Sequence, residues 1–185
     1  MGQLEIRRKT ADKVYISVEY VSHFREISRI TETLIDTGAT ISFVGINIIS
    51  GLKYNIDLDK LTLENLVGMY GITGAEPSRT RKQPKPKPRE RIYAAWAVNL
   101  KKIIVDDIVI NSPQVFIPLS FNFSAERKIA NVRFERVNMA LIGTDILRNY
   151  NYGVNIDESP IFTITTPTRE IPPRNTPIHH LDFED

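Results

Sequence analysis

The sequence predicts an all-β protein, and three observations support this fold class. Segments rich in β-branched and aromatic residues recur along the chain, and Lys13–Val21 is the clearest of them. These segments are short and are separated by glycine, proline or paired acidic residues. Helix-like spacing of apolar residues is confined to short stretches, such as residues 47–52.

Composition sets the bounds of the fold. The chain has 185 residues, of which 42% are hydrophobic and 25% charged, as expected for a globular domain with extensions. No apolar run approaches the roughly 20 residues that span a bilayer, and the N-terminus lacks an apolar signal core. The absence of cysteine excludes disulfides and thiol chemistry and fits a reducing compartment. We therefore expect a cytoplasmic protein with no membrane association.

The first half of the expected fold begins with two extended runs. Lys13–Val21 and Ile27–Ile35 suit antiparallel pairing with one face buried. Residues 47–52 suit one short helical turn, and residues 61–67 alternate as a strand does before a glycine cluster. Extended structure resumes over residues 92–100.

The second half is expected to add short strands and one helix. Strand-like runs occupy residues 103–105, 108–110, 115–117, 153–156 and 161–165, and Asp106-Asp107 suits a turn. Residues 118–131 suit a loop, and residues 133–141 should return to the core. Thr144 can cap a helix that runs to about Tyr150.

The Asp36-Thr37-Gly38 triplet is the strongest candidate for chemistry. It follows the apolar pair Leu34-Ile35, so a carboxylate stands where an expected buried strand ends in a glycine turn. Burial of a carboxylate is costly unless the group is paired, neutralised or functional. The position suits an acid that activates water, and the structural alternative is a turn aspartate at a strand end.

Three segments, taken in order, resemble the retropepsin-like aspartic peptidases. Residues 33–40 resemble the catalytic loop of that family, and residues 68–74 stand where the family places the tip of its flap. Residues 140–147 resemble the second signature of the family, in which two apolar residues and a glycine lead into a short helix. The resemblance covers about residues 13–157. It implies a closed, pepsin-like half-barrel with one short C-terminal helix, functional as a two-fold dimer.

The resemblance also implies peptide hydrolysis by a pair of aspartates. Two carboxylates about 3 Å apart share one proton, so that one activates water and the other polarises the scissile carbonyl. The chain holds one Asp-Thr-Gly and no Asp-Ser-Gly, and Asp145 is a poor substitute because it falls inside the second signature. We therefore expect the second carboxylate to be Asp36 of another copy, across a two-fold axis.

Neighbouring residues receive supporting roles. Thr37, Gly38 and Ala39 are expected to support the loop: the Thr37 hydroxyl can bond across the pair, and Gly38 can direct its N–H toward Asp36. Residues 141–143 are expected to pack behind the loop and to take no catalytic role. A glycine-rich hairpin can close over an extended peptide and bind it through main-chain bonds. The expected flap residues are Gly68, Gly71, Ile72, Thr73 and Gly74.

A basic segment interrupts the expected domain. Residues 79–91 hold seven Lys or Arg against one Glu and include alternating prolines, which favours a solvated, extended conformation. We expect a domain over residues 1–166, a basic proline-rich insertion at 75–91 beside the flap, and a flexible tail at 167–185. The basic run has no interleaved aromatic residue for base stacking, so nucleic acid is not an expected partner. His179-His180 suits a solvated tail better than a metal site.

The expected function is that of an aspartic endopeptidase. It would act on extended polypeptide as a homodimer, with no cofactor and no metal. One alternative is a catalytically silent dimeric module of the same fold that binds peptides or acts as a scaffold, because the insertion could block the flap. A second alternative is a processing enzyme of a mobile element, in which the basic segment contacts nucleic acid.

Overall fold

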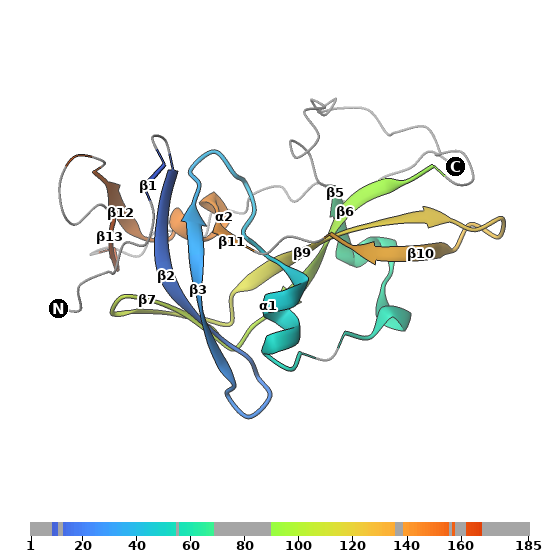
Figure 1. Ribbon diagram of the computed structural model, residues 1–185, viewed down its shortest axis with the longest axis horizontal. Helices are drawn as coiled ribbons and strands as arrows, with labels where there is room; N and C mark the ends of the chain where they lie inside the picture. Colours follow the sequence, from blue (N-terminus) through green and yellow to red (C-terminus); the bar gives the residue numbers. More distant parts are fainter. Residues whose placement is uncertain are drawn as a thin grey trace.

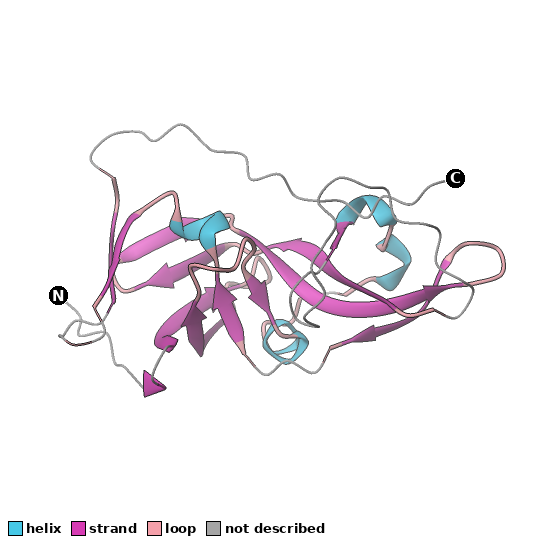
Figure 2. Ribbon diagram, turned by 90° about the horizontal axis from the view of Figure 1, so that it is seen from above, coloured by secondary structure: helices cyan, strands magenta, loops and turns pink. Residues whose placement is uncertain are grey.

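Strands dominate the fold. The structure is a computed structural model that describes residues 9–10, 13–54, 56–68, 90–135, 139–155, 157 and 162–167, with the backbone alone for 9–10. The strands are β1 (Lys9–Thr10), β2 (Lys13–Val21), β3 (Ser28–Ile35), β4 (Phe43–Val44), β5 (Leu66–Gly68), β6 (Ile92–Asn99), β7 (Lys102–Val105), β8 (Ile108–Asn111), β9 (Gln114–Phe123), β10 (Ile129–Phe134), β11 (Ala140–Ile142), β12 (Asn151–Val154) and β13 (Phe162–Thr165). Figure 2 shows how little helix accompanies them. The all-β prediction is confirmed.

The helices of the described residues are short. They are α1 (Ile46–Gly51), α2 (Thr144–Leu147) and the 3₁₀ turns η1 (Leu58–Lys60) and η2 (Leu63–Asn65). The first corresponds to the helical turn expected at residues 47–52, and α2 to the expected C-terminal helix, although α2 ends before Tyr150. Within the described residues, no helix is both long enough and apolar enough to cross a membrane.

One large sheet holds most of the strands. Its order is β5-β6-β9-β4-β11-β3-β2-β7-β8, with β1 added on β2 and β10 on β9 (Figure 1). The order runs from one edge strand to another, so the closed half-barrel that we expected is not found among the described residues. Among the described residues, β12 and β13 pair only with each other and form a separate two-stranded sheet.

The pairing of β2 with β3 shows why the sheet forms. Alternate residues of β2, from Val14 to Tyr20, point into the core, as a strand with one buried face requires. The two strands pair antiparallel from Val14 opposite Ile35 to Val21 opposite Ser28, as the sequence predicted. Tyr20 is fully buried, and its hydroxyl lies 2.9 Å from the Thr33 hydroxyl, so this polar group is satisfied inside the core.

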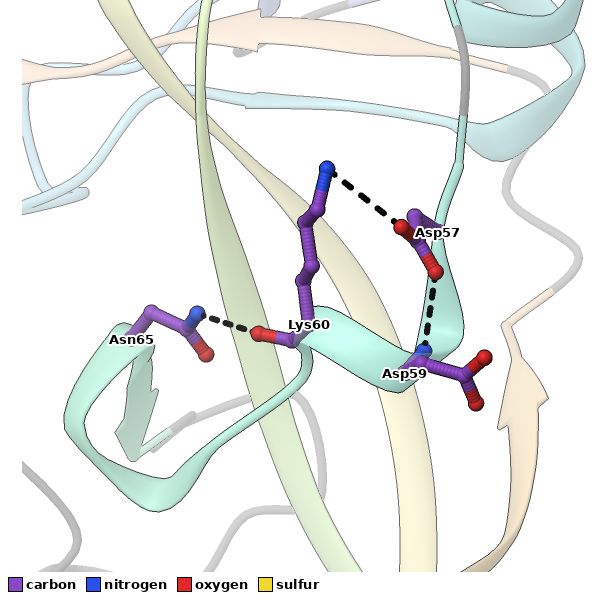
Figure 3. A network of polar contacts seen from close by, with 4 residues as sticks. All are labelled: Asp57, Asp59, Lys60 and Asn65. Atoms are coloured by element: carbon purple, nitrogen blue, oxygen red, sulfur yellow. Dashed lines mark hydrogen bonds and ion pairs between the residues drawn. The ribbon is translucent and has the colours of Figure 1, made fainter.

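The prediction of a strand over residues 61–67 is mostly wrong. Only β5 is extended, and η1 and η2 precede it because polar side chains bind the local backbone (Figure 3). Asp57 accepts a bond from Asp59 N at 3.2 Å and pairs with Lys60 at 3.4 Å. Asn65 donates to Lys60 O at 2.9 Å and accepts from Thr62 N at 2.9 Å. These bonds fold the chain into two tight turns directly before the strand that leads to the expected flap.

The prediction of a loop over residues 118–131 is also wrong. These residues instead form the second half of β9, a turn and the first half of β10. Pro118 interrupted the pattern in the sequence, but its carbonyl accepts a bond from Glu135 N at 3.0 Å, and it stands opposite Ala95 of β6. The strand continues because residues 115–121 are all buried, a run typical of a strand covered on both faces.

Candidate active site

Asp36 begins the loop that joins β3 to β4. Within this loop, Gly38 N donates to Asp36 Oδ1 at 2.9 Å and Ala39 N donates to Asp36 O at 3.2 Å. The Asp36 side chain is partly exposed, and Thr37 and Gly38 are exposed. The chain therefore turns tightly at the end of a buried strand and carries its carboxylate out of the core.

Strand β11 lies between the two strands that this loop connects (Figure 1). It runs parallel to β3, with Leu141 beside Leu34, and antiparallel to β4, with Leu141 beside Phe43. Residues 140–142 are buried. The structure thus brings the segment that resembles the second signature directly behind the loop that resembles the catalytic one.

The start and middle of the loop are fastened to the segment after β11. Asp36 N donates to Ile142 O at 3.1 Å. Ala39 O accepts two bonds from Thr144, one from the backbone N at 2.8 Å and one from the hydroxyl at 3.0 Å. We expected Thr144 to cap the helix, and that prediction is wrong: Gly143 is the N-cap residue, and the Thr144 hydroxyl is committed to the loop instead.

The far end of the loop is fastened by Ser42 and Asp145. Ser42 N donates to Asp145 Oδ2 at 2.9 Å, and Ser42 Oγ donates to Asp145 Oδ1 at 2.6 Å. Gly143 N donates to Ser42 Oγ at 2.9 Å, and Ile146 N donates to Asp145 Oδ1 at 2.9 Å. Ser42 is 1% exposed. We call this set of bonds the Ser42–Asp145 clasp.

Burial sets the acidity of Asp145. It raises the pKa of this carboxyl above the ordinary aspartate value, while the bonds from Ser42 and Ile146 and the nearby positive charge of Arg148 oppose the increase. Its oxygens accept three donors in all. A carboxylate so occupied has little capacity left to bind water or substrate, and Asp145 is therefore a structural group in this fold.

Gly143 permits the close approach of the two segments. A Cβ atom at this position would lie 2.7 Å from Ile41 O and 2.8 Å from Ala39 O, both of them backbone atoms. Real Cβ atoms do not approach backbone oxygens so closely, so the crossing of β11 behind the loop needs a residue without a side chain.

The Asp36 carboxylate has few partners. Among the described residues, Gly38 N is the one hydrogen-bond donor to it, and none of the ion pairs found there includes it. No group of three or more His, Cys, Asp or Glu that could hold a metal occurs in the same part of the chain. Within the described part of the chain, one oxygen of the Asp36 carboxylate therefore has no hydrogen-bond partner.

The structure describes only part of the expected site. It brings Asp36, Thr37, Gly38 and Ala39 together on one braced loop. Of the expected flap it describes Gly68, the last residue of β5. The other flap residues, Gly71, Ile72, Thr73 and Gly74, lie outside the described residues, as do most of the insertion at 75–91 and the tail beyond residue 167.

Sequence reasoning missed the clasp. Ser42 was not singled out, and Asp145 was considered only as a substitute for the second catalytic carboxylate. The sequence did contain a usable signal. Ser42 lies in an apolar stretch and Asp145 follows Gly143 by two residues, so both are polar groups in segments expected to be buried. Buried polar groups need hydrogen-bond partners.

Comparison with known proteins found a likeness to a solved structure. No protein-family model and no curated protein matches the chain. Among solved structures, the chain is similar to a retropepsin-like aspartic protease from Rickettsia conorii, with 15% sequence identity and a TM-score of 0.47 over 84% of this chain and 86% of that one. At that TM-score the match transfers neither fold nor function.

Proposed function

We propose that this chain is a retropepsin-like aspartic endopeptidase in which Asp36 of two copies forms the catalytic pair. One observation carries the proposal. Asp36 leaves the end of a buried strand on a loop fastened at its start, middle and far end, yet its carboxylate keeps an oxygen without a partner among the described residues. Acid–base catalysis requires a carboxylate that is held firmly in place and still has an oxygen that can exchange a proton.

The chemistry follows from sharing one proton. Two carboxyl groups about 3 Å apart cannot both ionise, so one stays protonated. The ionised group removes a proton from water, and the water oxygen attacks the carbonyl carbon of the peptide. The protonated group gives its proton to the carbonyl oxygen, which yields a tetrahedral intermediate with two hydroxyl groups. The group that took the proton from water then passes it to the peptide nitrogen, the other group takes a proton from one hydroxyl, and the C–N bond breaks to release an acid and an amine. The pair, rather than either residue, then sets the dependence of the rate on pH.

A second copy is needed to supply the second carboxylate. Asp145, the other aspartate near the loop, already accepts three donors and is tied to Ser42. Thr37 and Gly38, in contrast, are exposed in the single chain. Two such loops can meet across a two-fold axis, where each contributes the same residues.

Apolar side chains lie in a row beside the loop that carries Asp36. Cross-strand pairs place Leu34, Leu141, Phe43 and Phe116 side by side, and directly paired residues share one face of a sheet. Leu34 lies two positions before Asp36, and alternation along an extended chain puts these two side chains on one face. Leu34, Leu141 and Phe116 are buried in the single chain, so this row is part of the packing that supports the loop of Asp36.

The test is a digest of a peptide library by the full chain, with products read by mass spectrometry. We expect cleavage that a pepstatin-type inhibitor blocks and that Asp36→Asn removes, and we expect sedimentation to show a dimer for both proteins. A dimer that cleaves no peptide would favour the silent scaffold instead, and a fully active monomer would refute the paired mechanism.

A further inference from the structure

We propose that Asp145 is a positioning residue for the reaction, because it anchors the far end of the loop whose near end carries Asp36. The inference rests on the proposed peptidase function, since the placement of Asp36 affects a rate only where Asp36 reacts. Asp145 itself would not touch the substrate.

The clasp requires a carboxylate and not merely a polar group of the same size. The Asp145 oxygens face three donors: Ser42 N at Oδ2, and both Ser42 Oγ and Ile146 N at Oδ1. An asparagine has one oxygen and one NH₂ group. In one orientation its NH₂ would face Ser42 N–H, and in the other it would face Ile146 N–H. Either orientation sets donor against donor in a part-buried place, so the isosteric amide cannot replace the acid.

The serine side of the clasp is equally specific. The Ser42 hydroxyl donates to Asp145 and accepts from Gly143 N, so one small group joins the loop to both the strand end and the helix start. Ser42 N also donates to Asp145. The bonds therefore fix the backbone of Ser42, and not only its side chain.

The clasp can influence Asp36 because few other bonds hold the loop. Besides Ser42, the loop is tied to the segment behind it at Asp36 N and at Ala39 O. Loss of the clasp would free the Ser42 side chain and N–H, while Ser42 O still accepts from Phe116 N at 2.9 Å and the tie at Ala39 remains. The loop would then stay folded but become less sharply placed, and a displacement of about 1 Å at a reacting group can cost about 100-fold in rate.

The test compares Asp145→Asn and Ser42→Ala with Asp107→Asn, a matched control in the exposed turn after β7. Each full-length variant is assayed on a quenched peptide chosen from the wild-type digest, across a range of pH. For Asp145→Asn we expect kcat to fall roughly 10- to 100-fold, KM to change less than about threefold, and the limbs of the pH profile to move. Ser42→Ala should act in the same direction, the double variant should be no worse than Asp145→Asn, and Asp107→Asn should match wild type.

Two results would overturn the inference. The first is a folded, dimeric Asp145→Asn protein with the kcat and pH profile of wild type, and the second is a loss confined to KM. If Asp145→Asn does not fold, Ser42→Ala, which removes a single hydroxyl, decides by the same criteria. A wild-type protein without peptidase activity would refute the proposed function, and this outcome is distinct from an active wild type whose clasp variants are unimpaired.

Discussion

Two aspartates of this chain stand in mirrored triplets and have opposite surroundings. Asp36 begins Asp-Thr-Gly in a partly exposed loop, and Asp145 ends Gly-Thr-Asp at the start of α2. Asp36 accepts one bond, from Gly38 N, among the described residues, whereas Asp145 accepts three and is tied to Ser42. The same residue type is left available at one position and is fully occupied at the other.

The number of donors around a carboxylate limits the further contacts that it can make. A carboxylate that accepts several donors is fixed in place and stabilises the backbone around it. A carboxylate with a free oxygen, held on a firm loop, can exchange a proton with a substrate or with a second carboxylate. Here Asp145, which accepts three donors, supports the loop that carries Asp36. Substitutions at and around the two aspartates should therefore differ in the size of their effects.

The largest effect is expected at the available carboxylate. Asp36→Asn should lower peptidase activity by about 10²–10⁴-fold or more, because it removes the proton exchange, with little change in melting temperature. A mixing experiment sharpens the prediction. An equimolar mixture of wild type and Asp36→Asn, allowed to exchange subunits, should have about one quarter of the activity of wild type at the same total protein concentration, because random pairing leaves that share of wild-type dimers. An activity of about one half would mean that each chain works alone.

The next effect is expected where the two segments cross. Gly143→Ala places a Cβ against two backbone oxygens of the loop, so we expect a loss of about 1–3 kcal/mol in the free energy of unfolding together with a loss of activity. Chemical denaturation measures the first and the peptide assay the second. Gly153→Ala, whose Cβ would meet only the end of the Thr163 side chain, is the control and should have the smaller effect.

A smaller effect is expected beside Asp36. If the Thr37 hydroxyl bonds to the second loop, Thr37→Ala should lower kcat or weaken the dimer by about 2- to 10-fold, the worth of one hydrogen bond. Thr37→Ser keeps the hydroxyl and should restore most of the activity. Enzyme kinetics and sedimentation equilibrium measure these effects. If Thr37→Ala matches wild type in both, the Thr37 hydroxyl has no role in the site.

The smallest effect is expected in the pH dependence of stability. Because burial raises the pKa of Asp145 in the folded state, the folded protein binds its proton more tightly than the unfolded chain does. The stability this provides is complete below the unfolded pKa and is lost as pH rises through the raised pKa. Asparagine does not titrate, so the stability gap between wild type and Asp145→Asn should narrow over that range. Denaturation curves at several pH values would show the gap, and a gap that widens would contradict the raised pKa.

Sequence reasoning predicted the extended runs well where one strong pattern acted alone. Residues 13–21 alternate cleanly and form β2 as expected, and the turn at Asp106-Asp107 joins β7 to β8. It failed where local polar bonds or burial on both faces competed with the pattern. Asn65 helps turn part of the expected strand at 61–67 into the 3₁₀ turn η2. Pro118 interrupts the strand pattern in the sequence, although β9 continues through it.

The site was predictable in part for a related reason. The triplet at Asp36 is a local pattern, and the sequence displays it directly. The clasp joins residues 103 positions apart, and neither Ser42 nor Asp145 carries a local sign of its partner. Only the fold, which inserts β11 between β3 and β4, brings them together.

The position of β11 between β3 and β4 has a consequence for how the protein is made. Asp36 emerges from the ribosome long before residues 140–145, and without them its loop lacks the ties to Ile142, Thr144 and Asp145. Contacts so distant along the chain form late in folding. A nascent or truncated polypeptide that lacks residues 140–145 therefore carries Asp36 on a loop without these ties.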